Sequence, residues 1–236
     1  SKGLGFGCAN ALAAVGVNLV MCARGADRLT DSANQLRKKH GVEITEVVCD
    51  VTTDDGRAKI LDAAGQVDIL VNNAGAAWTA TYDEFPESGW DKVMDLNLKA
   101  LFFLTQKLTP LLRKSGNPSQ PAKVINIASI DGIHNARHEA YSYAASKAGL
   151  IHLTRRMAKR LVSENIHINA IAPGAFASDM NLWARDNPDE VAQRIPAQRI
   201  GKPSDIAGTA VYMCSSAGDY LVGITIAVDG GIAYAS

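Results

Sequence analysis

A tyrosine and a lysine stand four positions apart, at Tyr143 and Lys147, in a segment whose pattern predicts a helix. This spacing puts a phenol and an ammonium group on one helix face. A phenol titrates near about 10, so acid–base work near neutral pH requires a lowered pKa, which a neighbouring ammonium favours. Such pairs also occur by chance. Ser129, which follows a strand-like segment and can bring its hydroxyl to the same place, makes proton transfer to or from an oxygen atom the stronger interpretation.

Other polar residues also stand just beyond strand-like segments. They are Asp50, the run Asn72-Asn73-Ala74-Gly75, and the pair Pro173-Gly174. In open parallel sheets, ligands bind outside the carboxyl ends of the strands. These independent segments therefore predict one shared cleft.

Two further motifs have both a functional and a structural interpretation. Gly3-x-Gly5, opening a helix, would let the backbone approach a pyrophosphate at the positive end of that helix. A glycine-rich turn or a frayed terminus would show the same residues. Asn97 lies in an apolar helical stretch, where asparagine has poor propensity and needs partners if it is buried. An ordinary, hydrogen-bonded helix asparagine is the alternative.

The elements that must position these residues alternate along the whole chain. We expect strands at 17–23, 46–49, 69–71, 123–128, 167–172 and 224–228. We expect helices at 6–15, 27–39, 54–64, 90–113, 141–163 and 204–216. Such alternation predicts an α/β protein with a doubly wound parallel sheet, a Rossmann fold with helices on both faces. Because the chain starts inside a glycine-rich turn, we expect that a first strand of on the order of ten residues is missing from it.

Length and composition narrow the classes of protein further. At 236 residues and 47% hydrophobic, the chain suits one α/β domain that spans residues 1–236. Lys and Arg total 24, as do Asp and Glu, so no basic surplus would attract nucleic acid or an anionic membrane. No apolar run approaches the roughly 20 residues that span a bilayer. We expect a cytoplasmic protein.

Taken as an ordered set, these motifs resemble the short-chain dehydrogenase/reductase family over essentially the whole chain. The likeness is greatest to its 3-oxoacyl-(acyl-carrier-protein) reductases, such as those of rhamnolipid synthesis. The segments that carry it are Ser1-Lys2-Gly3-Leu4-Gly5, Cys49-Asp50-Val51, Asn72-Asn73-Ala74-Gly75, Asn97, Ser129, Tyr143-x-x-x-Lys147, Pro173-Gly174 and Val228-Asp229-Gly230-Gly231.

The resemblance implies a role for each catalytic candidate. Tyr143 would donate a proton to a carbonyl oxygen as hydride arrives from the nicotinamide, and Ser129 would orient that oxygen. Lys147 would lower the phenol pKa and hold the nicotinamide ribose, while Asn97 would fix a water in a proton relay. The implied cofactor residues are Lys2, Gly3, Leu4, Gly5, Arg24, Asp50, Val51, Asn73, Ala74, Gly75, Tyr143, Lys147, Pro173, Gly174 and Ser178.

The end of the strand at 17–23 indicates which cofactor is preferred. An acidic residue there would bind the ribose hydroxyls of NAD and repel a 2′-phosphate, but the strand ends with Ala23-Arg24. Lys2 can approach the same phosphate from the glycine turn. We therefore expect NADPH or NADP⁺ as the cofactor, with NADH disfavoured. Two exposed cations that serve only solubility are the alternative.

The substrate side is less defined by sequence. Residues 175–200 join the Pro-Gly turn to the next helix, and they form either a substrate lid or a helical pair that packs on a partner subunit. The candidate substrate residues are Trp78, Phe176, Met180 and Trp183. His134 and His138 lack metal-ligand spacing, so we expect no metal site.

These features predict an oxidoreductase that passes hydride from NADPH to a ketone, with a 3-oxoacyl thioester as one candidate substrate. A polyol, sugar or cyclic-alcohol dehydrogenase of the same family is the alternative enzyme. A catalytically silent NADP(H)-binding sensor or scaffold is the alternative outside enzymes, although binding alone would not require Ser129, Tyr143 and Lys147 together. Helices at 90–113 and 141–163 carry apolar residues beyond what one sheet face can cover, so we expect a homotetramer, with a dimer second.

Overall fold

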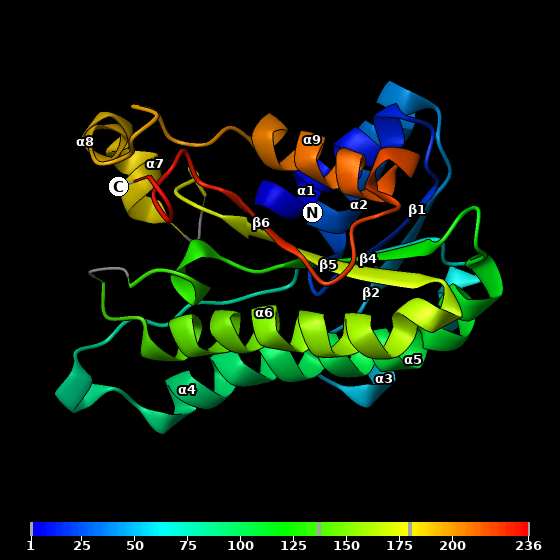
Figure 1. The fold of residues 1–236 in the computed structure, drawn as a ribbon, viewed down its shortest axis with the longest axis horizontal. Coiled ribbons are helices and arrows are strands. Elements are labelled where there is room, and N and C mark those ends of the chain that lie inside the picture. Colours follow the sequence, from blue (N-terminus) through cyan, green and yellow to red (C-terminus); the bar gives the residue numbers. More distant parts are fainter. Residues whose placement is uncertain (1, 136–137, 179–180, 236) are drawn as a thin grey trace.

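The fold is described from a computed structural model, which covers residues 2–135, 138–178 and 181–235. Its helices and strands alternate along the chain, as the sequence predicted (Figure 1). The strands are β1 Leu19–Ala23, β2 Ile44–Val48, β3 Ile69–Asn72, β4 Ala122–Ile127, β5 Ile166–Pro173 and β6 Thr225–Val228. The helices are α1 Gly3–Ala14, α2 Ala26–His40, α3 Asp54–Ala64, α4 Glu87–Met94, α5 Ala100–Ser115, α6 Tyr141–Leu161, α7 Leu182–Asp186, α8 Pro188–Gln193 and α9 Pro203–Cys214.

All strand pairs are parallel, which confirms the predicted α/β class. The strands form two sheets, one with the order β1-β2 and the other with the order β3-β4-β5-β6. In a doubly wound sheet of order 3-2-1-4-5-6, strand 1 joins strands 2 and 4. The two sheets match this order without strand 1. Here β1 and β2 take the places of strands 2 and 3. In the larger sheet, β3, β4 and β5 take the places of strands 4, 5 and 6.

Helices cover both faces of the larger sheet, as Figure 1 shows. Ile125 and Ile127 of β4 pack with α1 and α9 on one face. Their neighbour Val124 packs with Ile168 of β5 against α5 and α6 on the other. Successive strand residues point to opposite faces, so apolar residues at every position of a short strand predict burial on both sides. The core therefore holds β4 and β5 in place, and Ser129 and Gly174 follow their carboxyl ends.

Two predicted elements differ from the structure. The single helix expected at 90–113 starts earlier, at Glu87, and is interrupted by a π-helical turn, η2, at Asp95–Lys99. The segment 175–200 contains two short helices, α7 and α8. A π turn shifts the helical register by one residue, and such turns are frequent at functional sites. This one carries Asn97.

Among the described residues, no helix is both long and apolar enough to cross a membrane.

Candidate active site

Ser129 lies just past the carboxyl end of β4, where it begins a 3₁₀ turn, η3, at Ile130–Gly132. Its hydroxyl Oγ accepts a hydrogen bond from the backbone N–H of Asp131 at 3.2 Å. Ser129 is buried, and this bond fixes its side chain at the edge of the sheet. The structure thus places the hydroxyl where the sequence predicted it.

Tyr143 and Lys147 lie in the first two turns of α6, which packs against this edge. Lys147 Nζ donates a hydrogen bond to the backbone carbonyl of Ile127, the last residue of β4, at 2.7 Å. The same Nζ lies 5.6 Å from the centre of the Tyr143 ring. Lys147 is only 3% exposed. The strand end therefore brings the ammonium, the phenol and the Ser129 hydroxyl together.

The electrostatics of this group differ from the sequence prediction in one respect. Burial raises the pKa of the Tyr143 phenol to about 12, against the opposing effect of a hydrogen bond with Ser129. Burial also lowers the pKa of Lys147 to about 8. The prediction that the phenol pKa is lowered is therefore wrong for this structure, because desolvation disfavours the charged form of the phenol and raises its pKa. At neutral pH the phenol keeps its proton and can donate it.

Asn97 lies in the π turn with its side chain fully buried. Its Oδ1 accepts from the N–H of Ala76 at 2.8 Å, and its Nδ2 donates to the carbonyl of Ala76 at 2.9 Å and to Ser146 Oγ at 3.0 Å. A Cβ added to Gly75 would lie 3.4 Å from Asn97 Oδ1 and 3.6 Å from Lys147 Nζ. Asn97 therefore has the partners that a buried asparagine needs, and it connects the chain after β3 to α6.

The glycine turn meets the end of β3. Gly3 begins α1 with a φ of +57°, a conformation that favours glycine. A Cβ added to Gly5 would lie 2.4 Å from Asn73 Nδ2, so only glycine fits against the Asn73 side chain without displacing it. Leu4 packs on the core below, and Ala74 is half-buried beside Asn73. The structure thus brings the glycine turn next to the residues after β3, and the sequence assigned both segments to the cofactor.

The remaining cofactor candidates occupy other strand ends. Asp50, after β2, accepts two hydrogen bonds from Thr52, and these bonds lower its carboxyl pKa, with a smaller contribution from the Arg24 charge. Val51 is buried behind it. Arg24 follows β1 and is exposed. The Arg24 guanidinium is therefore close enough to Asp50 to act on it while it remains accessible to a ligand.

The Pro-Gly turn also lies where it was expected. Pro173 ends β5, and Gly174 donates its N–H to the carbonyl of Val228 at 3.0 Å. A Cβ on Gly174 would lie 2.7 Å from Asp229, so the backbones of these turns approach closely. Ser178 Oγ accepts from the N–H of Asn181 at 3.2 Å and shapes the start of the segment that follows. Lys2 precedes α1 and is exposed.

The three candidate substrate residues that the structure describes lie in different surroundings. Phe176 is 5% exposed and packs in the core against α9 and Gly201, so its assignment as a substrate residue is corrected to a core role. Trp78 is half-buried against α4, with its ring in the space that a Cβ on Gly89 would need. Trp183 lies on α7 and is 53% exposed. Met180 is outside the described residues.

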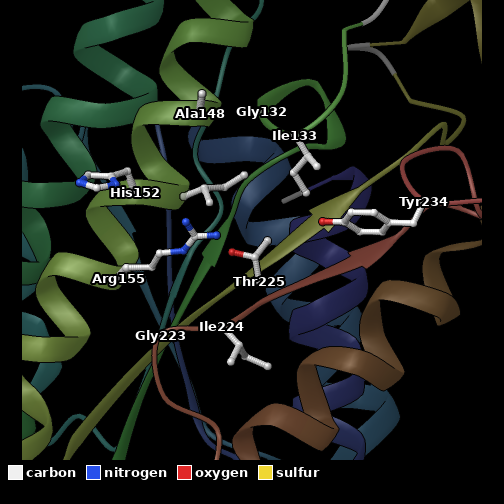
Figure 2. A pocket seen from close by; sticks show the side chains of 10 residues that line it. Gly132, Ile133, Ala148, His152, Arg155, Gly223, Ile224, Thr225 and Tyr234 are labelled. Carbon is white, nitrogen blue, oxygen red and sulfur yellow. The ribbon is translucent and has the colours of Figure 1, made fainter.

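A cavity of about 550 Å³ lies beside the turn η3, whose Gly132 lines it (Figure 2). Its lining residues include Ala148 of α6 together with Arg155, Thr225 and Tyr234. Figure 2 shows the polar ends of Arg155, Thr225 and Tyr234 directed into the space. None of the candidate catalytic or cofactor residues lines this cavity, so it is separate from the site.

Sequence reasoning missed Asp131, whose backbone holds Ser129, and Ser146, which holds Asn97. Asp131 could have been found from its position two residues after Ser129 in a segment of irregular pattern. Ser146 lies within the Tyr143-x-x-x-Lys147 motif, but its partner is far away in sequence and only the fold reveals it.

Comparison with known proteins identifies relatives over nearly the whole chain. A family model described as enoyl-(acyl carrier protein) reductase matches residues 1–233. The rhamnolipids biosynthesis 3-oxoacyl-[acyl-carrier-protein] reductase of Pseudomonas aeruginosa is 39% identical, with 98% of this chain and 92% of the relative covered.

Solved structures agree with this relationship. The Pseudomonas aeruginosa RhlG/NADP active-site complex matches with a TM-score of 0.93 and 39% identity, over 98% of this chain and 92% of that one. L-sorbose reductase from Gluconobacter frateurii, complexed with NADPH and L-sorbose, matches with a TM-score of 0.91 and 30% identity, over 99% and 93% of the two chains. The chain therefore belongs to the short-chain dehydrogenase/reductase family of oxidoreductases, as its motifs predicted.

Proposed function

We propose that this protein reduces a ketone to a secondary alcohol with NADPH, in a reversible reaction, and that Ser129, Tyr143 and Lys147 are its catalytic residues. The observation that carries the proposal is the meeting of these side chains at the end of β4, with Lys147 Nζ held on the Ile127 carbonyl at 2.7 Å. A phenol that remains protonated at neutral pH is suited to donate a proton to a carbonyl oxygen.

Each of these residues has a separate role in the proposed reaction. The Ser129 hydroxyl and the Tyr143 phenol both donate hydrogen bonds to the substrate oxygen, which stabilises the charge that develops there. Tyr143 then transfers its proton to that oxygen, and in the reverse direction its phenolate removes one. Lys147 supplies a positive charge beside the phenol and a donor for the nicotinamide ribose. Asn97 orients the turn at Ala76 and a water in the proton relay. The bound cofactor supplies the hydride.

The cofactor residues fit NADP(H). Because residue 5 is glycine, the Asn73 side chain can keep its position against α1. The N-terminal end of α1, with Lys2 beside it, favours a pyrophosphate. Arg24 follows β1 directly, near the position where an NAD-specific protein would carry an acid, and we assign it to the 2′-phosphate. Two relatives were solved with NADP or NADPH bound. The residues that complete the set are Gly3, Leu4, Asp50, Val51, Ala74, Gly75, Pro173, Gly174 and Ser178.

The substrate class follows from the relatives. A 3-oxoacyl thioester is our first candidate, because a 3-oxoacyl reductase is similar over 98% of this chain. A sugar or polyol is the second, because L-sorbose reductase shares the fold at 30% identity. Residues 175–200 would serve as the lid over either substrate, with Trp78 and Trp183 as candidate substrate contacts.

The test is a panel of ketones mixed with NADPH while cofactor absorbance is followed. The panel contains 3-oxoacyl thioesters, cyclic diketones and sugar ketones. Turnover on thioesters above the others supports the first candidate, and turnover on sugars alone supports the second. Tight NADPH binding without turnover of any ketone would instead indicate a sensor or scaffold.

We also propose that the whole of residues 1–236 acts as one catalytic domain in a cytoplasmic homotetramer. Phe103 on α5 and Trp90 on α4 are 40% and 42% exposed, and both lie in the segment 90–113 that the sequence assigned to a subunit interface. A second copy would cover them. Light scattering at micromolar concentration is expected to give the mass of a tetramer, and a monomer mass would overturn this part.

A further inference from the structure

The cavity beside η3 is lined by neighbours of the candidate catalytic residues, but by none of those residues themselves. Gly132 and Ala148 line it, and they follow Ser129 by three positions and Lys147 by one. Its other lining residues come from α6, β6 and the segments beside β6. None of them comes from α4 or α5, which carry the proposed subunit interface. A ligand in this cavity would therefore meet neither that interface nor the catalytic side chains.

Three hydrogen-bond donors from distant parts of the chain converge on this cavity. Arg155 comes from α6, Thr225 begins β6, and Tyr234 lies in the segment after β6. Figure 2 shows the guanidinium and the two hydroxyls directed into the same space. The packing of β6 agrees with this direction, because Ala227, two residues after Thr225 and on the same face, packs against the cluster that contains Ile151 of α6. The cavity thus presents one positive charge and two hydroxyls.

These donors have no partners of their own in the part of the chain that the structure describes. Thr225 Oγ1 is buried, and no described residue forms a hydrogen bond with it. Arg155 and Tyr234 form no hydrogen bond or ion pair with a described residue either, and both are exposed, so a ligand can reach them. A buried polar group without a partner costs free energy, which an acceptor on a ligand would recover.

The chemistry of the ligand follows from the lining of the cavity. No acidic side chain lines it, so the positive charge of Arg155 favours an anion and disfavours a cation. A carboxylate has only acceptors, on two oxygens, and therefore suits a set of donors. Ile133 and Ile151 also line the cavity, whose volume of about 550 Å³ is within the range of small-molecule sites. These isoleucines favour a ligand whose remainder is apolar.

We propose that this cavity is a binding site for a small aliphatic carboxylate, separate from the sites of the cofactor and the ketone. The Arg155 guanidinium pairs with the carboxylate, and the Thr225 and Tyr234 hydroxyls donate hydrogen bonds to its oxygens. The aliphatic chain lies against Ile133 and Ile151. Because the sites are separate, the carboxylate and NADPH bind to the protein at the same time.

The test measures the binding of hexanoate, acetate, hexanol and inorganic phosphate to the whole protein by isothermal titration calorimetry. Hexanoate should bind at least about tenfold more tightly than acetate, which lacks the apolar chain, and than hexanol, which lacks the charge. Phosphate also lacks an apolar chain and should bind more weakly than hexanoate. The affinity for hexanoate should be the same with and without saturating NADPH.

Two variants and a matched control assign the binding to this cavity. Arg155→Ala should weaken hexanoate binding by about tenfold or more, because it removes charge-assisted hydrogen bonds. Arg156→Ala is the control and should keep the wild-type affinity, since Arg156 is the next exposed residue on α6 and does not line the cavity. Thr225→Val should weaken binding by about threefold without lowering Tm, because the hydroxyl that it removes has no partner among the described residues.

Four results would overturn the inference. They are the absence of hexanoate binding in the millimolar range, equal affinities of Arg155→Ala and Arg156→Ala for hexanoate, displacement of hexanoate by NADPH, and phosphate binding that is as tight as hexanoate binding.

Discussion

The side-chain amide of Asn97 binds both polar groups of the Ala76 backbone, with Oδ1 accepting from the N–H at 2.8 Å and Nδ2 donating to the carbonyl at 2.9 Å. Asn97→Ala would leave both groups and Ser146 Oγ without this partner in a buried place. We expect a loss of about 2–3 kcal/mol in the free energy of unfolding. Ser146→Ala removes one partner only and should cost about 1 kcal/mol. Denaturant unfolding measures both, and a loss below that of Ser146→Ala would contradict the role given to Asn97.

Gly5 and Gly208 are both helical glycines, but only Gly5 is enclosed. An added Cβ at Gly5 would lie 2.4 Å from Asn73 Nδ2, whereas at Gly208 it meets nothing within 4 Å. Gly5→Ala should displace the Asn73 side chain and weaken NADPH binding by about tenfold or more, which corresponds to about 1.4 kcal/mol of binding free energy. Gly208→Ala should leave binding unchanged and stabilise the fold by about 0.5–1 kcal/mol. Equal affinities in a fluorescence titration of the two variants would contradict the prediction.

The buried ammonium of Lys147 gives a pH-dependent stability. Its pKa is about 8 in the folded protein and 10.5 in the unfolded chain, so the unfolded chain binds more protons between these values and stability rises with pH there. Lys147→Met removes the buried charge and the bond to Ile127. It should abolish turnover yet stabilise the fold by about 2 kcal/mol at pH 7, roughly 4–8 °C in Tm. That gain should shrink as the pH rises towards 10.5. A variant less stable than the wild type at pH 7 would contradict this.

Cofactor preference depends on Arg24 and Lys2 in our account. The native protein should prefer NADPH to NADH by at least about tenfold in kcat/KM, about 1.4 kcal/mol of discrimination. Arg24→Ala should remove much of this preference, and Ala23→Asp should shift it towards NADH by repelling the 2′-phosphate and binding the ribose hydroxyls. Turnover at saturating cofactor should change little in both variants. Equal affinity of the native protein for the two cofactors would refute the assignment while leaving the proposed carbonyl chemistry in place.

The parallel sheet and the polar residues that meet at its strand ends could be predicted from sequence. Short apolar runs mark the strands, and the polar residues that follow them are visible in the local sequence. The strand at 123–128 and Ser129 illustrate this. Sequence reasoning missed the π turn around Asn97, because one extra residue is a small change within a long helical pattern. Phe176 was assigned to substrate because it stands among charged residues, whereas the fold buries it against Gly201. The direction of the Tyr143 pKa shift was missed too, because burial depends on tertiary packing and not on the spacing to Lys147.

The central claim is that Tyr143 donates the proton to the carbonyl oxygen. Tyr143→Phe removes only the hydroxyl, so NADPH binding should remain nearly intact while turnover falls by about 10²-fold or more. The most direct measurement is single-turnover oxidation of pre-bound NADPH by a ketone that the wild type reduces, followed in both proteins with cofactor affinity measured in parallel. The account predicts equal affinity and a rate for Tyr143→Phe lower by about two orders of magnitude. A variant rate within a few-fold of the wild type would contradict it.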